Sequence, residues 1–102
     1  MPTEIHSEAD LEALVRDNPT VAAVFTAGWS RPCRLLELQL AQAESALPKG
    51  ARLIRADMDA LPASAEKLGV RSLPTLVIFR DGRAVRRSVG VQSAAGILEQ
   101  LR

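Results

Sequence analysis

The chain has 102 residues, 47% hydrophobic and 25% charged, which is enough for one domain with a real core and too little for two. A single cysteine excludes an intramolecular disulfide, and the formal net charge of +1 gives no overall bias toward nucleic acid or acidic ligands. Charge is nevertheless uneven: residues 1–20 hold five acidic side chains against one arginine, and residues 71–102 hold six arginines against two acidic side chains. We therefore expect one domain, residues 1–102, with oppositely charged solvated faces.

The start of the chain lacks the basic segment and apolar run of a secretory signal. No apolar run approaches the ~18 residues that a membrane helix needs. Repeats, low-complexity tracts and Gly/Ser/Pro-rich linkers are also missing from the sequence. These observations predict a cytoplasmic protein that does not associate with membranes.

The first elements are an extended segment, a helix and a buried strand. After a short extended start near Ile5, Ser7 with an acidic residue three positions later resembles a capping box and predicts a helix N-terminus. Apolar residues at helical spacing follow, and Asn18-Pro19 ends the helix. Residues 21–25 form a continuous apolar run of strand length, which is typical of a strand covered on both faces.

A long amphipathic helix follows the segment Gly28-Trp29-Ser30-Arg31-Pro32-Cys33. It begins at Pro32, because proline is tolerated in a first helical turn, and its apolar residues recur at helical spacing as Leu36, Leu40, Ala43 and Leu47. Pro48 and Gly50 close this helix. Residues 52–58 then predict a strand.

The remaining elements are a short helix, a hairpin and a final helix. Residues 63–68 predict the short helix, and residues 75–79 are a second apolar, β-branched strand. Asp81-Gly82 is a strong two-residue hairpin turn into a strand over 83–89, and Ser93 predicts the cap of the last helix. The resulting order, β-α-β-α-β-α-β-β-α, predicts an α/β fold with a central mixed β-sheet flanked by helices on both faces.

Cys33 is the residue whose position indicates chemistry. It falls in the first turn of the long helix, where the helix dipole and free backbone N–H groups favour a thiolate. The competing interpretation is a buried structural cysteine that acts as a small hydrophobe. Position alone does not choose between the two.

Two segments resemble the thioredoxin family. Trp29-Ser30-Arg31-Pro32-Cys33-Arg34 is similar to that family's Trp-Cys-Gly-Pro-Cys-Lys segment, and residues 70–75, Val-Arg-Ser-Leu-Pro-Thr, are similar to its cis-proline segment. Asp81-Gly82 and Val89-Gly90 fall at the family's later spacings, so the resemblance covers nearly the whole chain. It implies a thioredoxin fold.

The resemblance also implies a substrate site. Leu73-Pro74 would be a cis peptide facing the cysteine segment, and the Leu73 backbone would pair with an extended substrate. A shallow groove would be lined by Trp29, Arg31, Pro32, Leu73, Pro74, Val89, Gly90 and Val91. Ordinary edge-strand packing is the competing interpretation for the two valines.

The departures from the family pattern bear on the activity. The attacking cysteine of the family falls on Ser30, and Cys33 stands at the resolving position, so a dithiol cycle within this chain is impossible. Ser30 also lacks the partners of a serine nucleophile, because the one histidine, His6, is expected on the first strand. Val24 replaces a buried aspartate of many thioredoxins, and Arg55 corresponds to the lysine beneath the site.

The sequence is therefore compatible with two functions. In the first function, Ser30 and Cys33 are the catalytic positions. That function is a thioredoxin-like thiol-disulfide oxidoreductase scaffold acting on protein disulfides or thiols, in which Ser30 is either engineered or encoded by the gene. The resemblance implies a thioredoxin-reductase-like electron donor, and we expect a monomer without a cofactor. The alternative is a redox-silent protein-binding module that uses the groove around Trp29 and Pro74.

Other chemistries find little support in the sequence. One cysteine, one histidine and the pair Asp57 and Asp59 do not have the spacing of a zinc or calcium site, so we expect no metal. Arg80, Arg83 and two further arginines make a basic hairpin, yet aromatic residues are too few for base stacking. We therefore expect a solvated edge strand there and no nucleic-acid binding.

Overall fold

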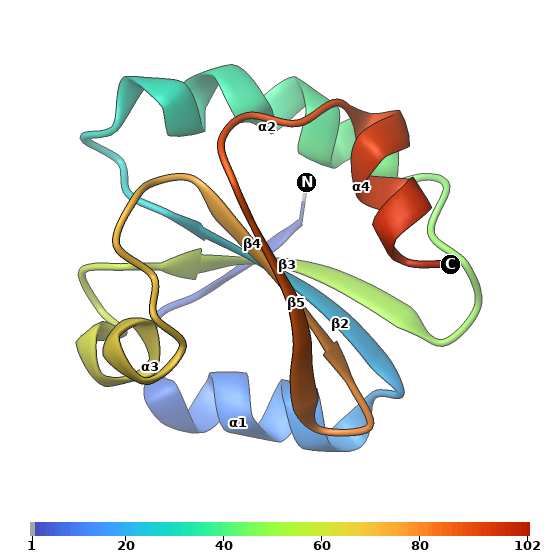
Figure 1. Cartoon of the computed structure of the whole chain (residues 1–102), viewed down its shortest axis with the longest axis horizontal. Coiled ribbons are helices and arrows are strands. Elements are labelled where there is room, and N and C mark those ends of the chain that lie inside the picture. The colour runs from blue at the N-terminus through green and yellow to red at the C-terminus, as the bar shows by residue number, and fades with distance from the viewer. Residues whose placement is uncertain (1) are drawn as a thin grey trace.

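The computed structural model describes residues 2–102. Within them the elements follow the predicted order (Figure 1): β1 (Thr3–Ile5), α1 (Glu8–Asp17), β2 (Thr20–Thr26), α2 (Arg31–Glu44), β3 (Ala51–Asp57), α3 (Pro62–Lys67), β4 (Thr75–Arg80), β5 (Arg83–Val89) and α4 (Ala94–Gln100).

The strands form one mixed sheet in the order β1-β3-β2-β4-β5. β1 and β2 both run parallel to β3, whereas β4 runs antiparallel to β2 and to β5. Helices α1 and α3 cover one face of the sheet, and α2 and α4 cover the other (Figure 1). This arrangement confirms the predicted α/β fold with helices on both faces.

Alternation along β2 divides the core between these two faces. Val21 and Phe25 pack with Leu11 of α1 in a cluster that we call the α1 face. Ala22 and Val24 pack with residues of α2 and α4 in a second cluster, the α2 face. All seven residues of β2 are half-buried or buried because helices cover both sides of this strand.

Local signals in the sequence set most element ends. The Ser7 hydroxyl accepts a hydrogen bond from the Asp10 amide at 3.1 Å, and the Ser93 hydroxyl accepts one from the Gly96 amide at 3.0 Å, so both predicted caps are confirmed. At the predicted hairpin turn Asp81 and Gly82 both have positive φ, as a type I′ turn requires.

Two predicted positions are shifted in the structure. α2 ends at Glu44, not near residue 47, because the backbone tightens after the C-cap Ser45, where the Ala46 amide donates to the Ala43 carbonyl at 3.1 Å. Leu47 still packs against the α2 face. His6 was expected on the first strand, but β1 ends at Ile5 and His6 follows it.

The basic hairpin is an exposed edge strand that is tied to neighbouring helix ends. Six of the seven residues of β5 are exposed. Arg80 donates to the carbonyls of Gln100 and Arg102 at the end of α4, and Arg87 donates to the Leu68 carbonyl at the end of α3. These arginines therefore donate hydrogen bonds to backbone carbonyls at the C-termini of two helices.

No helix within residues 2–102 combines the length and the apolar character that crossing a bilayer requires.

Candidate functional site

The N-terminus of α2 places Ser30 and Cys33. Ser30 is the N-cap residue, and its amide donates to the Ala27 carbonyl at 3.0 Å while its carbonyl accepts from the Arg34 amide at 3.3 Å. Within the described chain its hydroxyl makes no capping hydrogen bond, unlike the hydroxyl of Ser7. The hydroxyl of Ser30 is therefore not part of the structural support of α2.

Both predicted catalytic positions are buried. Ser30 is 6% exposed and Cys33, one turn into α2, is 4% exposed, whereas Arg31 and Pro32 between them are exposed. The resemblance gave residue 30 the place of the family's attacking cysteine. In the structure Ser30 is covered, and its amide closes a turn on the Ala27 carbonyl.

The proline segment lies beside the end of β5. The Leu73–Pro74 peptide is cis, and the Pro74 side chain is fully buried. The Gly90 amide donates to the Pro74 carbonyl at 2.9 Å, and Thr75 pairs with Val89 across the β4–β5 ladder. Pro74 and Gly90, which were predicted to share a groove, are thus joined directly by a backbone hydrogen bond, and Val89 pairs with the residue that follows Pro74. Gly90 has φ of 103°, a conformation that favours glycine.

Exposed apolar side chains surround this end of the molecule. Trp29 is 69% exposed and Val89 is 64% exposed, and Val91 is also exposed. The Trp29 indole N–H donates to Asp59 Oδ2 at 2.9 Å, which holds the ring toward the turn after β3. The sequence did not predict this role of Asp59, because thirty residues separate the two partners.

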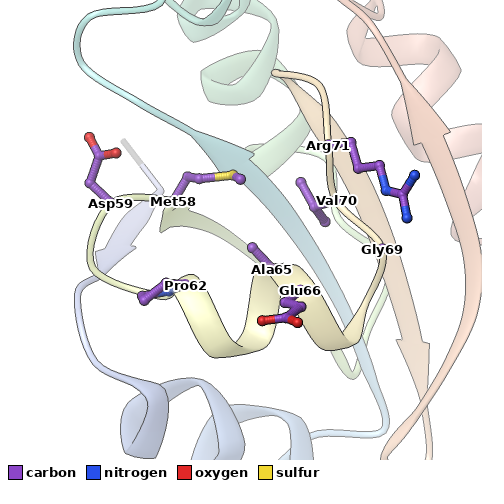
Figure 2. A pocket seen from close by; sticks show the side chains of 8 residues that line it. All are labelled: Met58, Asp59, Pro62, Ala65, Glu66, Gly69, Val70 and Arg71. Carbon is purple, nitrogen blue, oxygen red and sulfur yellow. The ribbon is translucent and has the colours of Figure 1, made fainter.

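A pocket of about 450 Å³ lies between α3 and the turns that flank it (Figure 2). Asp59 lines one end of it and Arg71 the other, with Glu66 of α3 between them. Because Asp59 also holds Trp29, the pocket borders the predicted groove. The other lining residues are Met58, Pro62, Ala65, Gly69 and Val70.

A smaller cavity of about 50 Å³ lies behind Cys33, with Glu37 and Arg55 among its lining residues. Arg55 forms ion pairs with Glu37 at 3.0 Å and with Glu4 at 3.4 Å. Its Nε atom is buried without a hydrogen-bond partner among residues 2–102. The sequence placed Arg55 beneath the site by resemblance but did not identify either carboxylate partner.

The sheet has the strand order β1-β3-β2-β4-β5, a cysteine lies in the first turn of α2, and a proline segment leads into β4. Together these features are typical of thiol-disulfide oxidoreductase scaffolds. The sequence profile described as Thioredoxin matches residues 2–102, nearly the whole chain. The chain belongs to the thioredoxin family.

Individual relatives agree with this assignment. A thioredoxin-like protein of Synechocystis is 38% identical over 90 residues, covering 88% of this chain and 86% of the relative. A thioredoxin of Chlamydia muridarum is 39% identical over 75 residues, covering 74% of this chain and 72% of the relative.

Solved structures agree on the fold. A mutant thioredoxin from Halobacterium salinarum, 33% identical, superposes with a TM-score of 0.87 over 98% of this chain and 87% of its own. A thioredoxin of Plasmodium falciparum, 22% identical, gives a TM-score of 0.89 over 98% of this chain and 99% of its own. The predicted thioredoxin fold is therefore confirmed.

Proposed function

We propose that this chain is a thioredoxin-family scaffold acting on protein disulfides or thiols, in which Cys33 is the one thiol and Ser30 occupies the attacking position. The observation that carries the proposal is the placement of Cys33. This sulfur lies in the first turn of α2, and because the chain has a single cysteine it is the only sulfur that can enter thiol-disulfide exchange.

The missing second thiol limits what this site can do. A thiolate at Cys33 that attacks a protein disulfide forms one new sulfur–sulfur bond, breaks the old one and releases the other substrate sulfur as a thiolate. The Ser30 hydroxyl contains no sulfur and cannot displace the bound substrate. Release therefore requires an external thiol, which a thioredoxin-reductase-like donor system would supply, and we expect the mixed disulfide to persist without one.

The first experiment compares this chain with its Ser30→Cys variant in the reduction of insulin by dithiothreitol. We expect the variant to turn over faster than the parent by on the order of a hundredfold or more, since a nucleophile is restored. Ser30→Ala is the matched control and should remain as slow as the parent. Rapid insulin reduction by the parent, or an inactive but folded Ser30→Cys variant, contradicts the proposal.

A redox-silent binding module is the second candidate function. It is favoured by the contrast between the buried Cys33 and the exposed apolar side chains of Trp29, Val89 and Val91. In this function a partner protein that binds the chain should bind the Cys33→Ala variant with unchanged affinity, whereas Trp29→Ala should weaken the complex. Loss of the complex on removal of the thiol favours the first function instead.

The cytoplasmic location and the monomeric state stay predictions.

A further inference from the structure

The parallel edge of the sheet brings three metal-binding side chains together outside the groove. His6 follows β1, with its Nε2 atom 3.3 Å from Glu4 Oε1 and its Nδ1 atom 3.3 Å from Asp57 Oδ2. One donor atom from each of the three residues lies within 4.8 Å of the other two. Fifty-one residues separate His6 from Asp57, so the sequence could not reveal this cluster.

The register of β1 against β3 builds the cluster. Glu4 pairs with Arg55 and Ile5 with Ala56, so the next position, His6, adjoins Asp57 at the end of β3. Side chains alternate along a strand, and Ile5 is buried in the α1 face, so Glu4 lies on the opposite side together with Arg55. Glu4 and Asp57 therefore project from strands of one sheet, and His6 directly follows β1.

Neighbouring groups fix the orientation of both carboxylates. Glu4 Oε2 is held by Arg55 at 3.4 Å, which leaves Oε1 directed at the imidazole. Asp57 Oδ1 accepts the Asp59 amide at 3.0 Å, which leaves Oδ2 directed at the other side of the ring. Outer contacts of this kind orient the ligands of protein metal sites.

The charges around the cluster favour a divalent cation. Glu4, Glu37 and Asp57 contribute three carboxylates, and Arg55 supplies one guanidinium, which is shared by the two glutamates. Two negative charges thus remain beside the imidazole. A divalent ion neutralises this excess, and one imidazole nitrogen with two carboxylate oxygens is a donor set that zinc accepts.

We propose that Glu4, His6 and Asp57 form a binding site for a divalent transition metal such as Zn²⁺. Ligand bonds of ~2.0–2.2 Å bring the donors closer than they lie now, and imidazole binds through one nitrogen only. His6, whose side chain is 62% exposed, can make this adjustment by rotation. The remaining coordination positions face solvent, so this is an open site, separate from the thiol chemistry proposed for Cys33.

Isothermal titration calorimetry with zinc chloride at pH 7.5 tests the proposal. We expect one Zn²⁺ per chain, and a loss of affinity of at least about tenfold in His6→Ala and in Asp57→Asn. Asp57→Asn keeps the side-chain oxygen that accepts the Asp59 amide, so this variant should fold. Cys33→Ser and Glu12→Gln are the matched controls for a thiol and for an exposed carboxylate of α1, and both should bind as the parent does.

The imidazole itself gives a second readout. The chain has a single histidine, so the ring signals in an NMR spectrum belong to His6, and Zn²⁺ should shift them while leaving the signals of the core unchanged. Zinc affinity that is unchanged in His6→Ala, or that disappears in Cys33→Ser, overturns the proposal. Unmoved ring signals at saturating Zn²⁺ overturn it as well.

Discussion

β3 presents two different faces to the helices that cover the sheet. Toward α1, Ile54 and Ala56 are both buried in an apolar cluster. Toward α2, Leu53 is buried in the core, but Arg55, two residues later, carries ion pairs. Asp57 then ends the strand beside His6. The α2 face therefore changes from core to polar network along one strand, whereas the α1 face remains apolar.

This difference separates the part of the sheet that stabilises the fold from the part that carries chemistry. The polar end of the α2 face adjoins the cavity behind Cys33, and the turn that follows contains Asp59, which holds Trp29. The apolar half of the same face packs against Leu36 and Leu40 of α2. A rigid core thus fixes the helix whose first turn contains Cys33.

The largest loss of stability should follow from a substitution in the apolar half of the α2 face. Leu53→Ala removes a fully buried side chain and leaves a cavity, so it should lower the free energy of unfolding by about 2–5 kcal/mol. Urea unfolding followed by circular dichroism measures this loss. Leu35→Ala is the matched control, because Leu35 on α2 is 64% exposed and should change stability by less than about 0.5 kcal/mol. A loss below about 1 kcal/mol for Leu53→Ala would mean that this half is not the stabilising core.

The sequence predicted the elements because each has a local signal. Apolar runs marked β2 and β4, and Asp81-Gly82 marked the hairpin. Cys33 was predicted from its position in the first turn of the long helix, whereas Trp29 was predicted as a site residue only from the resemblance of a contiguous segment to the thioredoxin family. The end of α2 was placed too late because the spacing of Leu47 continues the apolar stripe after the backbone has already turned at Ser45.

The polar network could not be predicted, because its members come from separate segments. Arg55 meets Glu37 only when α2 packs on the sheet, and it meets Glu4 only through the register of β1 against β3. The burial of Ser30 is likewise a result of chain folding around the α2 N-terminus. A sequence motif specifies which residue occupies a position, while these contacts depend on tertiary packing.

The second prediction compares two helix N-termini, one on each face of the sheet. Ser7→Ala removes the hydroxyl that caps α1 and should lower the free energy of unfolding by ~1 kcal/mol. Ser30→Ala should lower it by no more than a few tenths of a kcal/mol, because its hydroxyl makes no capping bond within the described chain. Thermal unfolding of the parent and of both variants under the same conditions measures the two losses of stability. Equal losses would show that Ser30 supports α2 after all.

Arg55→Met should change the free energy of unfolding far less than Leu53→Ala, although Arg55 lies on the same strand and face as Leu53. Arg55→Met removes two partly exposed ion pairs, but it also removes a buried Nε that has no hydrogen-bond partner within residues 2–102. These contributions oppose each other, so the free energy of unfolding should change by less than about 1 kcal/mol in either direction. Urea unfolding at low and high salt checks this, since the remaining charges of Glu4 and Glu37 repel each other less at high salt. A loss as large as that of Leu53→Ala would place Arg55 in the stabilising core and remove the distinction between the two halves of the face.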